Sequence, residues 1–170
     1  MLLIDFDENY PHFCSESKEL DLSVKKGAIV IDLDGTLQNV DHRVKHVQKE
    51  PKDWKAFNSG LIDDPINKWC LELINAMGTK GYRVILLTGR SDRWRDLSVK
   101  WLKDHDVSFE KLFMRPHLDM REDHFVKESI YLNEIEPEYD VLFVVEDRLS
   151  VVKMWRKIGV TCLQCDWGDF

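Results

Sequence analysis

The stretch IVIDLDGTL, residues 29–37, decides how the rest of the chain is organised. Its aliphatic and β-branched beginning favours a strand that is buried on both faces, with Asp32 and Asp34 projecting to the same side at a period of two. Gly35 then allows a sharp turn. Two neighbouring carboxylates repel each other unless a cation or a shared proton relieves the conflict. The stretch therefore indicates a reactive or cation-binding site at a strand end. A purely structural Asp-Gly turn is the alternative.

Length and composition indicate one globular domain. The 170 residues suffice for one sizeable core, and 44% hydrophobic with 32% charged residues is typical of a soluble protein. No apolar run approaches the ~20 residues that span a bilayer, and the first residues lack the basic region of a secretory signal. A cytoplasmic location with no membrane partner is the default expectation.

The net charge of −7 is distributed unevenly along the chain. Residues 1–23 carry −5, which leaves −2 for the remainder. Because the remainder is nearly neutral, binding of a long polyanion would depend on local basic patches. We interpret residues 1–27 as an acidic arm that either packs on the body or mediates self-association into a homo-oligomer.

The four cysteines are too scattered to form a disulfide framework. Cys162 and Cys165 have the spacing of a redox or zinc pair, but they lie in an expected strand. An offset of three places two strand side chains on opposite faces. The pair is therefore expected to have no metal or redox role.

Strand and helix patterns alternate along the chain after the first strand. Asp64 and Pro65 resemble a cap and a first-turn proline of a helix, and Gly81 marks its end. Between them the apolar residues of the helix recur at helical spacing, namely Ile66, Trp69, Cys70, Leu73 and Met77. Further patterns predict strands at 82–87, 112–114, 141–145 and 160–163, with helices at 91–105, 121–135 and 149–158 between them. The alternation predicts an α/β fold in three layers, with helices on both faces of a mostly parallel sheet.

Residues 38–63 form an insertion that is too long for an ordinary connection between a strand and a helix. Aromatic residues Trp54 and Phe57 are interleaved there with basic residues, namely Arg43, Lys45, His46, Lys49, Lys52 and Lys55. Placed after the acidic strand, the insertion would overhang a pocket as a lid. A solvated basic surface with a small aromatic anchor is the alternative.

Three polar clusters follow three of the expected strands. They are Asp32 with Asp34, Thr88-Gly89-Arg90, and Glu146-Asp147-Arg148. Ligands of parallel α/β sheets bind beyond the carboxyl ends of the strands, where these clusters would meet. The sequence therefore predicts one polar site built from all three.

The pattern Asp-x-Asp-Gly-Thr after an aliphatic strand resembles the nucleophile motif of the haloacid dehalogenase (HAD) superfamily, most of whose members are magnesium-dependent phosphohydrolases. The hypothesis is that Asp32 attacks phosphorus and forms an aspartyl-phosphate. Asp34, whose pKa would be raised by the neighbouring anion and the phosphate, would protonate the leaving oxygen and then deprotonate the attacking water. The expected ligands of Mg²⁺ are Asp32, the backbone carbonyl of Asp34, and Asp147. Phosphoryl oxygens would be bound by Thr88, Gly89 and Lys127.

From residue 29 to residue 170 the chain resembles more closely the 3′-phosphatase domain of the phage-type polynucleotide kinase-phosphatase. The matching stretches are Asp32-Leu-Asp-Gly-Thr-Leu, Arg115 followed by Asp119-x-Arg121, Val126-Lys127-Glu128, the run from Val151 to Val160, and Gly168-Asp169-Phe170. The resemblance implies a phosphatase domain over residues 28–170. It also implies catalytic or metal roles for Asp32, Asp34 and Asp147, and substrate or phosphate contacts for Arg43, Thr88, Arg90, Arg115 and Lys127.

Three departures from this resemblance limit what can be carried over. Glu146 replaces the first Asp of an Asp-Asp pair, so either direct or indirect metal binding is open for it. Residues 44–61 are longer than their counterpart, in the region expected to set substrate choice. No Gly-x-x-x-x-Gly-Lys-Ser/Thr phosphate loop occurs in the 170 residues, so ATP-dependent 5′-phosphorylation is not expected.

The sequence supports one main function and leaves two alternatives. The main one is a magnesium-dependent phosphatase that removes a 3′-phosphate from a nucleic-acid end or a nucleotide, as in DNA or RNA repair. The first alternative keeps the chemistry but acts on a small phosphomonoester such as a 5′-nucleotide, because these residues recognise the phosphate rather than the leaving group. The second is a catalytically silent module that only binds phosphate.

Overall fold

The computed structural model describes residues 24–168. The strands within this range form one five-stranded parallel sheet. The strand order is β3-β2-β1-β4-β5, with β1 at the centre. The strands are β1 (Lys26–Ile31), β2 (Arg83–Ser91), β3 (Lys111–Arg115), β4 (Tyr139–Glu146) and β5 (Cys162–Gln164). The predicted parallel α/β sheet is therefore confirmed. The predicted acidic arm at residues 1–27 lies almost wholly outside the described residues.

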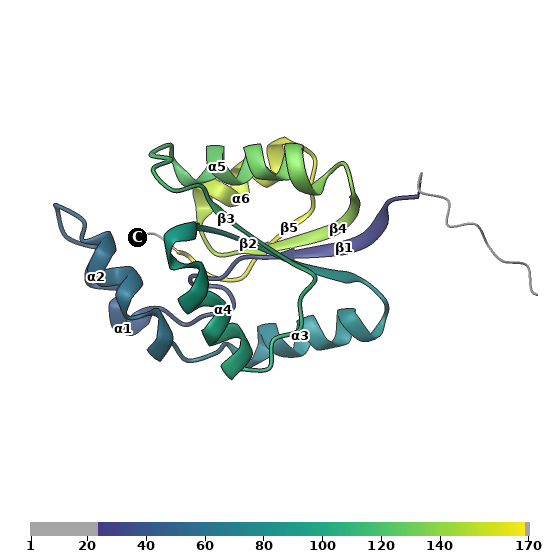
Figure 1. Cartoon of the computed structure of the whole chain (residues 1–170). Helices are drawn as coiled ribbons and strands as arrows, with labels where there is room; N and C mark the ends of the chain where they lie inside the picture. Colours follow the sequence, from purple (N-terminus) through teal and green to yellow (C-terminus); the bar gives the residue numbers. More distant parts are fainter. Residues whose placement is uncertain (1–23, 169–170) are drawn as a thin grey trace, which may run out of the picture.

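Helices cover both faces of the sheet, which confirms the three layers (Figure 1). One face carries α3 (Lys68–Thr79) and α4 (Arg95–Asp104), and a 3₁₀ turn at Asp92–Trp94 precedes α4. The other face carries α5 (Asp123–Ile130), its π-helical continuation η3 (Tyr131–Ile135), and α6 (Leu149–Lys157). Among the described residues, none of these helices is both long and apolar enough to cross a membrane.

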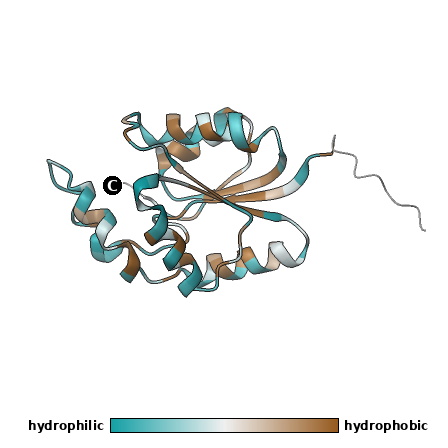
Figure 2. Cartoon of the chain, viewed as in Figure 1, coloured by the Kyte–Doolittle hydropathy of each residue, from teal (hydrophilic) through white to brown (hydrophobic). Residues whose placement is uncertain are grey.

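Strand β1 is buried on both faces, as its aliphatic sequence predicts. Ile29 and Ile31 pack into the core beneath α3 and α4, while Ala28 and Val30 pack into the core beneath α6 and η3. Figure 2 shows hydrophobic residues concentrated along the strands and on the helix faces turned toward them. Burial on both faces fixes the direction of β1 and so holds its carboxyl end in place.

The insertion at residues 38–63 is folded rather than extended. It contains α1 (Asp41–Val44), α2 (Trp54–Ser59) and the 3₁₀ turn η1 (Leu61–Asp63), and it lies at the carboxyl end of the sheet (Figure 1). A small core of its own is formed by Val40, Val47 and Phe57. This position is compatible with the predicted lid, whose movement remains a prediction.

Two local predictions are wrong. The helix expected to start at Pro65 begins at Lys68 instead, because the Asp64 side chain does not cap it and binds Arg43 and His42. Trp69, expected to face the core at helical spacing, is 48% exposed. The predicted geometry of the cysteine pair is correct, because Cys162 and Cys165 pack against opposite faces of the sheet.

Candidate active site

The three predicted polar clusters meet at the carboxyl edge of the sheet. The end of β1 lies between β2 and β4, and the Asp32 backbone N–H continues the ladder by donating to the Val145 carbonyl at 3.1 Å. Across the β1–β2 boundary, the Thr88 hydroxyl donates to Asp34 Oδ2 at 3.5 Å. On the β4 side, Asp32 shares a lysine with Glu146. The parallel topology therefore builds one site from segments far apart in the sequence.

An acidic cluster forms the centre of this edge. Asp32, Glu146 and Asp147 are all buried, and each offers an oxygen within 4.8 Å of the others. Burial raises the pKa of Asp32 well above its ordinary value, and it raises the pKa of Glu146 and of Asp147 to about 7 in the metal-free protein. Gathering carboxylates out of water is unfavourable without a compensating cation.

The cluster fits a hard divalent cation. Its donors are all carboxylate oxygens, the type that Mg²⁺ prefers, and Asp147 Oδ2 is buried without a hydrogen-bond partner in the described part of the chain. Gly35 and Gly168 both pass so close to this carboxylate that a Cβ at either position would overlap it. The Gly168 backbone N–H also donates to the Asp147 carbonyl at 3.2 Å. Two glycines thus leave room around an oxygen that is open for a ligand.

Lys127 is the buried cation of the cluster. Its ammonium, carried on α5, donates to Asp32 Oδ1 at 2.6 Å and to Glu146 Oε2 at 2.7 Å, and lies 3.7 Å from Asp123. Burial opposes its charge, but Asp32 and Glu146 outweigh burial and raise the pKa of Lys127. The side chain is therefore held as an ammonium beside Asp32, at the place where the sequence predicted a phosphate-binding charge.

Asp34 lies in a different environment from Asp32. Its carboxylate binds the guanidinium groups of Arg43, at 2.5 Å, and of Arg90, and it does not belong to the acidic cluster. Burial would raise the pKa of Asp34, yet the two arginines outweigh burial and hold it well below its ordinary value. The raised pKa that the sequence predicts for Asp34 refers to a site that holds a phosphate, and it stays a prediction.

Arg43 is buried and bound to protein carboxylates on both sides. Its Nε donates to Asp64 Oδ1 at 2.7 Å, its Nη2 donates to Asp64 Oδ2 at 2.5 Å, and its guanidinium stacks 4.1 Å from the Phe57 ring centre. The sequence assigned Asp64 to a helix cap and missed this role. No local pattern could have revealed it, because the contact depends on how the insertion folds back onto β1. In the substrate-free protein Arg43 thus holds Asp34.

Arg90 is also buried, and it ties Asp34 to the insertion. It donates to Ser98 Oγ at 2.8 Å and to Gln38 Oε1 at 2.6 Å, and its Nε has no partner among the described residues. Thr88, two residues earlier, accepts from the Arg90 backbone N–H at 3.1 Å. The predicted substrate contacts Arg43 and Arg90 therefore act on Asp34 in this structure, and direct contact with substrate remains a prediction for both.

Arg115 lies at the end of β3 and is positioned by a residue that the sequence did not single out. Its Nε donates to the Gly89 carbonyl at 2.6 Å, and its Nη2 lies 3.2 Å from Asp123 Oδ1. Asp123 also lies 3.7 Å from Arg148, and its carboxylate fills the space that a Cβ on Gly89 would need. Asp123 thus links Gly89, within β2, to Lys127 and Arg115.

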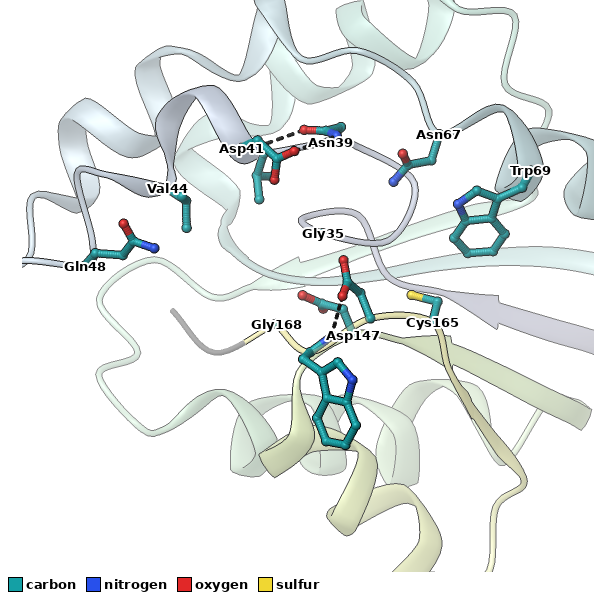
Figure 3. Close-up of a pocket in the computed structure, with 13 residues that line it drawn as sticks. Gly35, Asn39, Asp41, Val44, Gln48, Asn67, Trp69, Asp147, Cys165 and Gly168 are labelled. Atoms are coloured by element: carbon teal, nitrogen blue, oxygen red, sulfur yellow. Dashed lines mark hydrogen bonds between the residues drawn. The ribbon is translucent and has the colours of Figure 1, made fainter.

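A cavity of about 280 Å³ opens beside this site (Figure 3). Gly35 and Asp147 belong to its lining, together with residues of the insertion, the start of α3 and the segment after β5. Figure 3 shows Gln48 and Trp69 at opposite sides of the view, with Gly35 and Asp147 between them. The candidate metal ligand Asp147 is therefore reached from a cavity large enough for part of a ligand.

Comparison with known proteins agrees with this geometry. A protein of Autographa californica nuclear polyhedrosis virus, named a putative bifunctional polynucleotide kinase/RNA ligase, is 32% identical over 135 residues, which is 78% of this chain and 18% of that protein. A chain in the structure of the Pnkp1/Rnl/Hen1 RNA repair complex superposes with a TM-score of 0.74 at 31% identity, covering 90% of this chain and 48% of that one. This chain thus spans only part of both.

A more distant structure shows the same fold. The class C acid phosphatase from Bacillus anthracis has a TM-score of 0.63 at 15% identity, covering 86% of this chain and 68% of that chain. The family model described as the polynucleotide kinase PNKP phosphatase domain matches residues 26–170, nearly the whole chain. The chain therefore belongs to the PNKP phosphatase-domain family and is a HAD-type phosphatase.

Proposed function

We propose that this domain is a magnesium-dependent phosphomonoesterase that removes the 3′-phosphate from a nucleic-acid end. The observation that carries the proposal is the position of Asp32. It ends the central strand, lies 2.6 Å from the Lys127 ammonium, and shares the acidic cluster with Glu146 and Asp147. A carboxylate nucleophile, a fixed positive charge and a divalent cation site are what phosphoryl transfer to a carboxylate requires.

The acidic cluster would hold the metal ion. Its ligands would be the carboxylates of Asp32, Asp147 and Glu146 with the backbone carbonyl of Asp34. A bound Mg²⁺ would supply positive charge that neutralises the phosphoryl oxygens as charge shifts during the reaction. Lys127 already places one positive charge between Asp32 and Glu146, which limits the repulsion among the carboxylates.

Asp32 would act as the nucleophile. Its carboxylate oxygen forms a bond to phosphorus, while the bond from phosphorus to the 3′-oxygen of the sugar breaks. The Thr88 hydroxyl, the Gly89 backbone N–H and Lys127 would hold the phosphoryl oxygens. Water then attacks the phosphorus of the aspartyl-phosphate, the Asp32–phosphate bond breaks, and inorganic phosphate leaves.

Asp34 would carry the proton. It gives a proton to the departing 3′-oxygen and takes one from the attacking water in the second step. In the substrate-free protein it is ionised between Arg43 and Arg90. An incoming phosphate dianion both repels the Asp34 charge and competes for the two guanidinium groups, so its pKa rises when the substrate is bound.

The nucleic-acid substrate is supported by the relatives. The viral protein is named for polynucleotide kinase and RNA ligase, and the Pnkp1 structure is that of an RNA repair complex. We extend this context to the present chain and propose a role in repair of DNA or RNA ends. Arg115 and Arg148, at the rim of the site and each partly exposed, suit contacts to the phosphates of a strand.

The test compares phosphate release from a 3′-phosphorylated oligonucleotide, a 3′-mononucleotide, a 5′-mononucleotide and an aryl phosphate, each with magnesium and with EDTA. We expect the highest kcat/KM for a 3′-phosphate and no turnover in EDTA. Asp32→Asn should abolish turnover. Asp140→Asn is the control and should leave turnover unchanged, because Asp140 is an exposed residue on β4. A preference for the 5′-mononucleotide would contradict the proposed substrate, and turnover by Asp32→Asn would contradict the mechanism.

A further inference from the structure

The cavity beside Asp147 is lined by two tryptophans that do not belong to the core. Trp69 lies in the first turn of α3 and is 48% exposed, while Trp167 follows β5 and is 78% exposed. By contrast, Trp101 and Trp155 are almost completely buried. Neither cavity tryptophan stacks on another aromatic ring within the described residues. Two large flat side chains thus line the cavity outside the hydrophobic cores.

The polar part of the lining carries no positive charge. Three carboxamides, Asn39, Gln48 and Asn67, line the cavity with three carboxylates, and no lysine or arginine between residues 24 and 168 does so. Asn67 Nδ2 donates to the Thr36 carbonyl at 2.8 Å, which fixes the orientation of that amide. A phosphate would be repelled here, whereas the neutral edge of a nucleobase carries the donors and acceptors that amides bind.

The cavity is continuous with the reaction centre. Gly35 and Asp147, which line it, are the glycine of the nucleophile motif and a candidate metal ligand. A ligand that fills the cavity would therefore reach the reaction centre. The two arginines of the rim, Arg115 at the end of β3 and Arg148 after β4, do not belong to this lining. Charge separates the two regions: the rim suits phosphates and the cavity suits an uncharged ring.

We propose that this cavity, named here the base pocket, binds the terminal nucleobase of the substrate by stacking on Trp69 and Trp167, with Gln48 and Asn67 bonding to its edge. The proposal rests on the proposed 3′-phosphatase function and deepens it. Stacking on an aromatic side chain tolerates any base. The pocket therefore selects a substrate that carries an unpaired base at its end, over one that offers only a sugar phosphate.

The experiment measures binding in an Asp32→Asn background with magnesium, so that turnover does not interfere. Two fluorescein-labelled, 3′-phosphorylated oligonucleotides are compared by anisotropy. They have the same sequence, but the last nucleotide of the second lacks its base. We expect the abasic strand to bind about 5- to 150-fold more weakly, which is the range for removing one stacked base.

Variants then locate the effect. Replacing both tryptophans by alanine should bring the ratio of the two Kd values close to one, and Trp167→Phe, which keeps an aromatic face, should restore part of it. Trp54→Ala removes another exposed tryptophan, on α2 and outside the pocket, and should keep the wild-type ratio. Circular dichroism of each variant checks folding, and the phenylalanine variant remains informative if the double variant does not fold.

The outcomes separate the two proposals. A ratio near one with intact tryptophans, or a ratio that the double variant leaves unchanged, would overturn the base pocket even if the enzyme removes 3′-phosphates efficiently. If the protein with an intact Asp32 does not hydrolyse the 3′-phosphorylated oligonucleotide, the proposed function fails, and the Kd ratio still decides whether the pocket binds a base.

Discussion

Replacing Asp64 with asparagine should destabilise the protein and slow catalysis, although Asp64 is not expected to touch the substrate. Its side chain is fully buried and accepts two hydrogen bonds from Arg43, at 2.7 and 2.5 Å, while His42 Nε2 lies 2.7 Å away. Asparagine keeps one acceptor oxygen but turns an NH₂ group toward a guanidinium and removes the negative charge. Arg43 then has Asp34 as its remaining carboxylate partner.

The structure sets the size of the effect. Removing one partner of a buried ion pair costs about 3–5 kcal/mol of unfolding free energy. Because Arg43 retains Asp34 and asparagine retains one acceptor, we expect the lower end, about 3 kcal/mol. Arg43 would also lose the anchor that fixes its bond to Asp34. A displacement of about 1 Å in a reacting group can cost about 10²-fold, so kcat should fall by that order.

Urea denaturation followed by circular dichroism gives the stability, and phosphate release from a 3′-phosphorylated oligonucleotide gives kcat. Asp63→Asn is the matched control, because Asp63 is exposed, and it should change stability by no more than about 0.5 kcal/mol. The magnesium concentration for half-maximal activity should stay constant, since the Asp34 side chain that Arg43 holds lies outside the acidic cluster. Equal stability of the two variants, or a loss that magnesium restores, would refute this account.

Three further predictions concern the acidic cluster. Lys127→Met leaves the buried carboxylates without their cation. It should lower the unfolding free energy, measured by urea denaturation above pH 7, by about 3–5 kcal/mol, and it should abolish turnover. An unchanged unfolding free energy would show that the carboxylates are protonated instead. In the metal-free protein, burial raises the pKa of Glu146 and of Asp147 to about 7, so the folded form holds protons that the unfolded form releases from about pH 4 upward. Stability in EDTA should therefore fall as the pH rises from about 4 to 7, and magnesium should flatten this slope; a slope of the opposite sign would contradict the raised values. Gly168→Ala should increase the magnesium concentration needed for half-maximal activity, because its Cβ would displace the Asp147 carboxylate. Gly78→Ala is the control, because Gly78 lies on α3 with open space around it. This variant should stabilise the protein by about 0.5–1 kcal/mol and leave the magnesium requirement unchanged.

The sequence predicted those parts of the site that depend on local patterns. Asp32 follows a buried strand and Thr88 lies near the carboxyl end of another, and parallel topology brings such strand ends together whatever the details of packing. Lys127 was placed by its resemblance to a family motif. The sheet, its helical layers and the position of the insertion follow from hydrophobic periodicity in the same way.

The parts that the sequence missed depend on contacts between distant segments. Asp64 has the local pattern of a helix cap, but tertiary packing turns it toward Arg43 and the helix starts later. Asp123 begins α5 like any helix-initiating acid, and its contact with Arg115 appears only when β3 and α5 are in place. Trp69 fits the apolar spacing of α3, yet it faces the cavity. Hydrophobic periodicity shows that apolar residues share one face of a helix, but it does not show that a neighbouring element covers each of them.

The opposite environments of the two motif carboxylates assign their roles. Asp32 and Asp34 are two residues apart, at the point where the strand ends at Ile31 and Gly35 adopts a positive φ of 89°, yet their carboxylates have different partners. Asp32 joins Lys127 and the acidic cluster, whereas Asp34 is held by Arg43 and Arg90 as a stable anion. A stable anion cannot protonate a leaving group until something displaces or offsets its arginines. The dianionic phosphate does both, so we infer that Asp34 becomes a competent acid only when a phosphate ester fills the site.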